Sequence, residues 1–369
     1  MKKFGFIIMI AAAVVAMVSS CNEMTPANET AMGDLVLTIG DAPSTKAASI
    51  TPEDYEKSIN SLDLYVFEGG SVLYFHERLT PGGTPADTSR LEYSFNNTSG
   101  SISAKVKKLP ATNYTLLFVA NIPSNKLSGL TTVSAIEGAG IDLSNCSTTA
   151  SSGFAMFAKK ENVSVTGGQT TTVSGNIELE RFASRVRLVS VKNGIPSSAA
   201  YANNNQITIN GIFLSNVASA WTLGAANEPT TATNVRGKQN NANITPSTGV
   251  TYPVTLKAGT EAISQGSTKP LGWNTYAFQT KSVLSGATEP KLVICATVNG
   301  TLYYYPVFLV QGAPYEVRGG IERNKSYDIT LEISGTGSTD PDARVERGSI
   351  AATVTVKAWT PGEEYSENI

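Results

Sequence analysis

The sequence has very little histidine: His76 is the single one among 369 residues. A Ser-His-Asp or Cys-His catalytic site would have to use this residue, and an imidazole-based zinc site needs more histidines than the chain has. His76 lies in the stretch "VLYFHER", where nothing resembles a nucleophile motif. We therefore expect a half-exposed strand histidine, and we expect no enzyme activity, metal or other cofactor.

Cysteine is scarce as well, with three residues at Cys21, Cys146 and Cys295. Their spacing contains no C-x-x-C pair and no zinc-binding pattern. Cys146 lies in the polar stretch "LSNCSTT" and Cys295 in the apolar stretch "KLVICATV". Because these stretches fall in different halves of the chain, we expect no disulfide between them.

Charge is low for a chain of this length. Charged residues make up 16% of the sequence, and the formal net charge is −2. This balance gives no reason to expect nucleic acid or an anionic membrane surface as a partner. A solvent face built from Thr and Ser in place of charged residues is typical of extracellular β-proteins.

Long apolar runs are absent beyond the start of the chain. The one run, Phe4 to Val18, follows two lysines and is short for a membrane span, which is typical of a signal peptide over residues 1–20. It ends in "VSSC", which resembles the lipobox of bacterial lipoproteins. In those proteins the cysteine thiol, here that of Cys21, is acylated and the cysteine becomes the mature N-terminus. An ordinary signal peptide followed by an incidental cysteine is the alternative.

Short alternating segments separated by turn residues fill the rest of the chain. Gly69-Gly70 and Asn299-Gly300 each separate two apolar segments, which predicts β-hairpins. No long amphipathic helical pattern interrupts these segments. The pattern therefore predicts an all-β protein with two β-sandwich domains that divide near Arg181.

Two of these segments present a clear apolar face. In "DLVLTIG" the face consists of Leu35, Leu37 and Ile39. In "SIAATVTVKAW", near the C-terminus, the face consists of Ile350, Ala352, Val354 and Val356. A strand needs neighbours for its backbone N–H and C=O groups, yet we expect no further strand after this last one. Its partner is therefore not evident within the chain.

Three other stretches contain residue types that could carry chemistry. Residues 335–344, "GTGSTDPDAR", have glycines and carboxylates, but the next element is a strand and the EF-hand spacing is absent. Glu178 and Glu180 share a strand face, and the tyrosines at 303–305 could stack on sugars. A connecting loop, a solvated sheet face and core packing are the favoured interpretations.

Several stretches together resemble the fimbrillins of Bacteroidota, the subunits of type V pili, and their order covers nearly the whole chain. In chain order they are the lipobox, "STKAAS" (44–49), "YTLLFVANIP" (114–123), "LERFASRVRL" (179–188), "IERNKSYDITLEISGTGSTDP" (321–341) and "VTVKAW" (354–359). The resemblance implies that both predicted domains are β-sandwiches of transthyretin-like type.

The resemblance also implies a route of assembly. The precursor reaches the outer membrane as a lipoprotein, and an extracellular trypsin-like protease cleaves the loop after the first strand, here between Lys46 and Ala47. The family more often has Arg at this position. The lipid and the first strand then leave together, and a C-terminal segment of another subunit fills the groove. The expected parts are a signal peptide (1–20), a propeptide with the releasable strand (21–46), an N-terminal domain (47–180) and a C-terminal domain (181–369) ending in the donor segment (349–369).

On this interpretation the protein is a structural subunit of a cell-surface fimbrium. Its expected partners are other copies of itself, other fimbrial subunits, the outer-membrane lipid and the protease, and ligands on host or bacterial surfaces stay open. An accessory or tip subunit is the alternative within the family. A glycan-binding surface lipoprotein that keeps its lipid is the alternative outside it.

Overall fold

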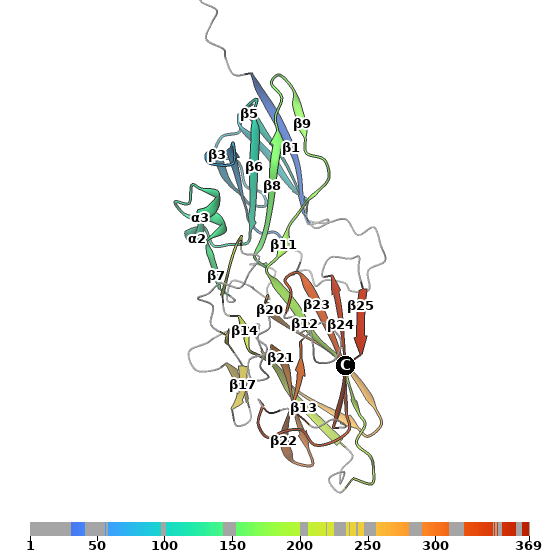
Figure 1. Ribbon diagram of the computed structural model, residues 1–369. Helices are drawn as coiled ribbons and strands as arrows, with labels where there is room; N and C mark the ends of the chain where they lie inside the picture. The colour runs from blue at the N-terminus through green and yellow to red at the C-terminus, as the bar shows by residue number, and fades with distance from the viewer. Residues whose placement is uncertain are drawn as a thin grey trace, which may run out of the picture.

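The computed structural model describes residues 31–40, 56, 58–96, 101–142, 153–199, 206–218, 220–224, 234–235, 237–240, 243–246, 256–279, 290–309, 321–341, 343, 345, 349–358 and 364–368. Their strands form two groups of sheets. Figure 1 places the N-terminal group and the C-terminal group at opposite ends of an elongated molecule.

The N-terminal half contains two five-stranded sheets. One has the strand order β10-β1-β5-β4, with β9 also paired to β1, and the other has the order β11-β8-β6-β2-β3. The strands are β1 (Met32–Gly40), β2 (Leu62–Glu68), β3 (Val72–Leu79), β4 (Leu91–Asn96), β5 (Ser101–Pro110), β6 (Asn113–Ala120), β8 (Met156–Ser164), β9 (Thr170–Thr172), β10 (Ile177–Glu178) and β11 (Glu180–Arg181). Apolar side chains of both sheets, such as Ile102 and Phe118, meet in one core.

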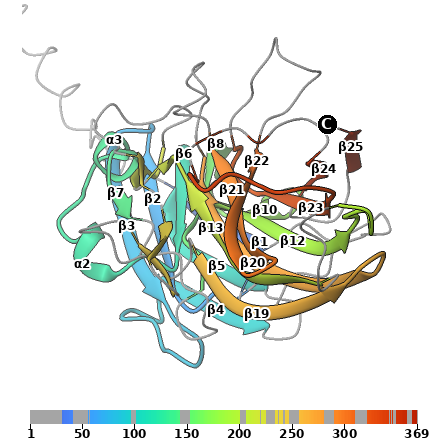
Figure 2. The ribbon, with the colours of Figure 1, turned by 90° about the horizontal axis from the view of Figure 1, so that it is seen from below.

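The C-terminal half contains a five-stranded sheet of order β20-β12-β23-β24-β25 and a four-stranded sheet of order β19-β13-β21-β22. The strands are β12 (Ala183–Asn193), β13 (Gln206–Ser215), β19 (Leu256–Ser264), β20 (Thr268–Phe278), β21 (Lys291–Val298), β22 (Thr301–Phe308), β23 (Lys325–Ile333), β24 (Ile350–Ala358) and β25 (Glu364–Asn368). A second core joins these sheets through residues such as Ile329 and Ile294. Figure 2 shows how strongly β19, β20 and β12 curve around it.

Helix is a small minority, as the sequence predicts. Two helices have described bounds, α2 (Ser124–Leu127) and α3 (Val133–Glu137), and Glu56 is also helical. The remaining strands pair two by two: β7 (Gly140–Asp142) with β15 (Ala220–Thr222), β14 (Val217–Ala218) with β16 (Asn234–Val235), and β17 (Gly237–Asn240) with β18 (Asn243–Pro246). Within the part of the chain that the structure describes, neither helix has the length and apolarity needed to cross a membrane.

The two halves meet in a third apolar cluster. Tyr65 and Phe154 of the N-terminal half lie in it together with Trp221 and Tyr276 of the C-terminal half. The rings of Phe154 and Tyr276 contact each other, with their centroids 4.7 Å apart. Burial of large aromatic side chains stabilises such a junction, because each removes a large apolar area from water.

The all-β prediction and both hairpins are confirmed. Gly69 and Gly70 have φ of +55° and +76°, and Asn299 and Gly300 have φ of +48° and +77°. Tight hairpin turns require left-handed values of this kind, and they explain the residue types. At Phe182 the chain passes from β11 in an N-terminal sheet to β12 in a C-terminal one. The exact domain boundaries stay a prediction.

Candidate strand-exchange site

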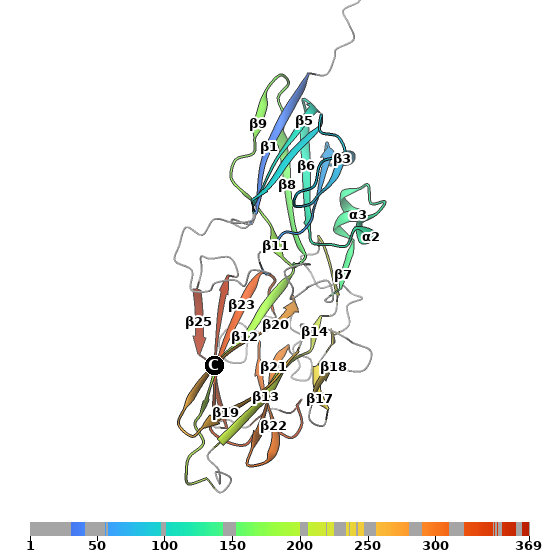
Figure 3. The same cartoon turned by 180° about the vertical axis from the view of Figure 1, so that it is seen from behind.

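Strand β1 is internal to its sheet and is held along both edges, as Figure 3 shows from behind. It pairs antiparallel with β5 on one edge and in parallel with β9 and β10 on the other. Backbone hydrogen bonds on the second edge include Asp34 N to Gln169 O at 2.9 Å and Val173 N to Val36 O at 3.0 Å. Removal of β1 would therefore expose two strand edges at once, and exposed edges readily pair with another chain.

The predicted inward face of β1 is confirmed. Leu35, Leu37 and Ile39 are fully buried and lie in the N-terminal core. Across β5 they stand opposite Val106, Ala104 and Ile102, in that order. Loss of a buried side chain of this size costs on the order of 2–5 kcal/mol where the site does not collapse. Strand β1 is therefore part of the core itself.

An ion pair near the start of β1 adds to these contacts. Lys105 Nζ lies 2.8 Å from Asp34 Oδ2, and the backbone N–H of Lys108 donates to Asp34 Oδ1 at 3.3 Å. The hydrogen bond from Lys105 holds the pKa of the Asp34 carboxyl below its ordinary value of 3.8, although burial opposes this effect. Ionised Asp34 therefore stabilises the packing of β1 on β5.

Replacement of Asp34 by asparagine in the uncut precursor is expected to lower the free energy of unfolding by about 0.2–1 kcal/mol at pH 7, because the pair is partly exposed. Since the folded pKa lies below the ordinary value of 3.8, this contribution is present above that pH and is lost as the pH falls through the folded pKa. Urea titrations of the wild type and Asp34→Asn at pH 7 and at about pH 3 measure it. A difference that does not shrink at the lower pH would contradict this assignment.

Strand β24 is not the unpartnered last strand that the sequence predicts. It pairs antiparallel with β23 through nine residue pairs, from Ile333 with Ile350 to Lys325 with Ala358. Its other edge pairs with β25, a strand that sequence reasoning missed. The predicted donor segment, residues 349–369, therefore contains two strands, and both belong to the five-stranded C-terminal sheet of their own chain.

The predicted apolar face of β24 is confirmed where the structure describes its side chains. Val354 is 2% exposed in the C-terminal core, and the partly buried Ile350 and Ala352 pack against the same core. The side chain of Val356 lies outside the described residues, although its backbone pairs with Tyr327. The alternation suits a strand that inserts one face into a sandwich, whether that of its own chain or of another.

The residues predicted for processing lie outside the described residues. These are Cys21, Lys46 and Ala47. The nearest described residues on either side of Lys46 are Gly40, at the end of β1, and Glu56. Acylation and cleavage therefore stay predictions, and the structure shows how the chain is held at these two flanking points.

Glu56 is fully buried in a site that we call the Glu56 seat, formed by Arg181, Arg185 and Tyr276. Arg185 Nη1 donates to Glu56 Oε2 at 3.0 Å, and the Tyr276 hydroxyl donates to Oε1 at 2.8 Å. Arg181 Nε donates to the backbone carbonyl of Glu56 at 2.7 Å. Both the side chain and the main chain of Glu56 are thus fixed. Removal of the Glu56 carboxylate would leave the buried Arg185 without this partner, which would strongly destabilise the fold.

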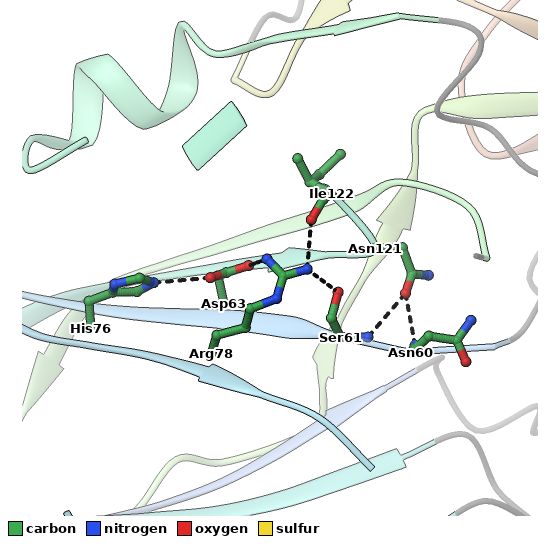
Figure 4. Close-up of polar contacts among 7 residues, drawn as sticks. All are labelled: Asn60, Ser61, Asp63, His76, Arg78, Asn121 and Ile122. Carbon is green, nitrogen blue, oxygen red and sulfur yellow. Dashed lines mark hydrogen bonds and ion pairs between the residues drawn. The ribbon is translucent and has the colours of Figure 1, made fainter. Parts of the chain in front are cut away.

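A second anchor follows directly, and we call it the Asn121 clasp. Asn121 Nδ2 donates to the carbonyl of Ser58 at 2.8 Å, and Asn121 Oδ1 accepts from the N–H groups of Asn60 at 2.8 Å and Ser61 at 3.4 Å. Figure 4 shows Arg78 beside it, donating to Ser61 Oγ. Asn121 has φ of +59°, a conformation that asparagine tolerates better than most residues. Residues 58–61 are therefore bound at successive backbone groups.

Sequence reasoning missed both anchors, although its motifs contain them. Asn121 belongs to "YTLLFVANIP", and Arg181 and Arg185 belong to "LERFASRVRL". The motif "IERNKSYDITLEISGTGSTDP" (321–341) supplies two further partners. Asn324 accepts a hydrogen bond from Arg181 Nη1 at 3.3 Å, and Ser326 accepts one from Arg185 Nε at 3.0 Å. The available signal was a pair of arginines four residues apart, which share one face when the segment is extended; in the structure Arg181 ends β11 and Arg185 lies in β12. Glu56, the partner of both arginines, lies more than a hundred residues upstream and has no comparable pattern around it in the sequence.

His76 is confirmed as a half-exposed strand histidine, with a side chain 38% exposed. Its Nε2 lies 3.0 Å from Asp63 Oδ1, and its ring stacks on Tyr65 with the centroids 4.1 Å apart. Arg78 Nη1 binds the other Asp63 oxygen at 2.7 Å (Figure 4). Each carboxylate oxygen of Asp63 therefore has a side-chain partner, and His76 has a structural role.

The other residues considered for chemistry occupy ordinary structural positions. Tyr305 is fully buried, and Tyr304 is nearly so. Cys295 is a buried free thiol whose pKa is raised by desolvation, and Cys146 lies outside the described residues. Glu180 pairs with Arg323 at the sheet edge. Among the described residues, no three His, Cys, Asp or Glu side chains gather as a metal site would require.

Comparison with known proteins agrees with this architecture. A fimbrilin from Porphyromonas gingivalis superposes with a TM-score of 0.59 at 16% identity, over 90% of this chain and 99% of that one. A candidate cell adhesion protein from Bacteroides eggerthii gives 0.59 at 20% identity, over 89% and 96%. Another from Parabacteroides distasonis gives 0.60 at 16% identity, over 91% and 99%. At such identities the likeness establishes the fold. None of the curated proteins compared with the chain matches it.

The paired sheets place the protein in the class of β-sandwich proteins that share the fold of these three structures. The model of the family described as Fimbrillin-A associated anchor proteins Mfa1 and Mfa2 matches residues 43–364, and the chain belongs to this family. The protein is therefore a fimbrial subunit, and its family is one of fimbrial proteins and not of enzymes. Association with other fimbrial subunits at the cell surface follows from that membership.

Proposed function

We propose that the protein is a polymerising subunit of a type V fimbrium, exported as a lipoprotein acylated at Cys21. Its two sandwich domains, 47–180 and 181–369, form the repeating unit. A trypsin-like protease cleaves after Lys46, and the fragment 21–46 leaves with β1. The C-terminal segment of another copy then enters the vacated groove.

The observation that carries the proposal is the position of β1. This strand supplies three fully buried side chains to the N-terminal core and pairs on both edges, yet a single connection, residues 41–55, separates it from Glu56. That connection contains Lys46 among small residues. One cut there would make β1 a separate, non-covalently held strand whose departure leaves a matched groove. An extended segment with alternating apolar residues fits such a groove through main-chain hydrogen bonds.

The covalent step is peptide hydrolysis. Water adds across the Lys46–Ala47 bond, which leaves a carboxylate on Lys46 and an amino group on Ala47. No residue of this chain takes part in the bond cleavage, because the protease supplies the catalytic groups. Exchange of strands afterwards makes and breaks only non-covalent contacts. Each subunit offers a donor segment and a groove on different surfaces, so the contact is heterologous and builds an open filament.

An anchor subunit is the second candidate, because the family description names anchor proteins. Such a subunit would keep its lipid and its first strand. The presence of Lys46 favours the cleaved, polymerising role. An accessory or tip adhesin would also be cleaved but would not use its C-terminal segment as a donor. A glycan-binding lipoprotein would stay acylated and would not enter filaments.

The N-terminus of the mature protein tests the proposal. Protein in surface filaments is expected to begin at Ala47, as mass spectrometry of sheared filaments would show. Lys46→Gln should leave acylated precursor that stays out of filaments, and Cys21→Ala should leave unprocessed precursor. An N-terminus at Cys21 in polymerised protein would exclude cleavage and favour the anchor role.

A further inference from the structure

Two lysines, and no arginine, lie between β1 and β2. They are Lys46 and Lys57, and both fit the preference of a trypsin-like protease. Cleavage after Lys57 would remove Glu56 along with the propeptide and would leave Ser58 as the first residue. The preference of a trypsin-like protease for lysine does not by itself distinguish the two positions.

The structure distinguishes them through the residues next to Lys57. On its N-terminal side, Glu56 is fully buried, with its carbonyl bound by Arg181 and its carboxylate bound by Arg185 and Tyr276. A protease must draw several residues on both sides of the scissile bond into its cleft as an extended strand. Occupation of the Glu56 seat prevents this on the N-terminal side.

The C-terminal side of Lys57 is held as well. Ile59 is 8% exposed and packs in the N-terminal core. The Asn121 clasp binds the carbonyl of Ser58 and the N–H groups of Asn60 and Ser61. These are backbone groups that a protease cleft would need for its own hydrogen bonds. Hydrolysis of the Lys57–Ser58 bond therefore requires local unfolding of buried structure.

We propose that the Glu56 seat and the Asn121 clasp restrict processing to Lys46 by denying the protease access to Lys57. This inference rests on the proposed function, since it concerns where the maturation cut falls. The anchors also fix the chain at Glu56, so that the segment kept after the cut, residues 47–55, stays joined to the junction of the two halves. Strand β1, on the other side of the cut, has no such covalent connection left.

Brief treatment of the full-length precursor with trypsin, followed by mass spectrometry of the new N-termini, tests this. The wild type is expected to yield Ala47 and almost no Ser58. Glu56→Ala removes one partner of a buried ion pair, and we expect cleavage after Lys57 to accelerate by about 100-fold or more. Glu56→Gln, which keeps the side-chain volume, should act in the same direction, and near-UV circular dichroism verifies that each variant is folded.

Three further variants make the result specific. Asn121→Gly permits the left-handed backbone and removes the Asn121 clasp, so it should also allow cleavage after Lys57. Glu56→Ala combined with Lys57→Gln should lose the new N-terminus. Leu331→Ala, which creates a core cavity distant from both anchors, should destabilise the fold without a specific increase in cleavage after Lys57.

Equal Ala47 and Ser58 products from the wild type, or folded anchor variants that still lack the Ser58 product, would overturn the inference. Absence of any Ala47 product from the wild type would instead overturn the proposed cleavage after Lys46.

Discussion

Replacement of Leu37 by alanine is expected to lower the free energy of unfolding of the uncut precursor by about 2–5 kcal/mol and to leave the assembled filament unchanged. The first effect follows from the full burial of Leu37 in the N-terminal core. The second follows from the proposed departure of β1 on maturation, which takes the altered residue away. Urea titration of the precursor and thermal dissociation of filaments measure the two effects.

Leu64→Ala is the matched control for this experiment. Leu64 is equally buried in the same core, but it lies on β2, which stays in the mature subunit. It should destabilise precursor and filament alike. Filaments that Leu37→Ala weakens as much as Leu64→Ala does would show that β1 remains in the mature subunit, and strand exchange at this groove would then be excluded.

Replacement of Val354 by aspartate is expected to abolish filaments, and the structure adds a second consequence. Val354 is 2% exposed in the core of its own C-terminal half, so the carboxylate would be buried without a partner before assembly as well as after it. The cost, about 3–5 kcal/mol or more by analogy with broken buried ion pairs, is a large part of a typical domain stability. Val354→Asp is therefore expected to destabilise the uncut precursor as well as to prevent polymerisation. Circular dichroism of the precursor and electron microscopy after protease treatment measure both consequences.

Thr353→Asp is the control, because it places the same charge on the opposite face of β24, across from the exposed Thr330. Thr355, the neighbour on that face, is less suitable because it stands opposite Asp328 on β23, where a second carboxylate would be repelled. Thr353→Asp should fold and assemble. Normal filaments from Val354→Asp, or from a chain that lacks residues 349–369, would show that this segment is not the donor.

The pairing of β24 with β23 and β25 also changes the energetics expected for assembly. A strand already paired on both edges gains little by moving unless the groove in the next subunit offers more contacts than its own sheet does. In this scheme cleavage makes the additional contacts available, because the groove exposes a core and two strand edges only after β1 departs. The donor is therefore expected to remain in its own sheet in the uncut precursor.

The sequence determined the local features of this fold. Alternation at Leu35, Leu37 and Ile39 could be read directly as a buried strand face, because side chains in a strand alternate between two sides. The turns at Gly69 and Asn299 could be predicted equally well, because few residue types tolerate positive φ. The all-β class followed from the number of such segments.

The tertiary structure alone decided which of these segments pair and which charges meet. Strand β25, with the sequence "EYSEN", has no apolar alternation, and only its neighbour β24 makes it a strand. Glu56 is one of 30 acidic residues, and nothing local marks it as the partner of Arg185. Alternation and turn preference act over a few residues, whereas burial of a carboxylate against an arginine 129 positions away depends on how two halves of the chain come together. That is why the buried face of β1 could be predicted from the sequence, and the anchors at Glu56 and Asn121 could not.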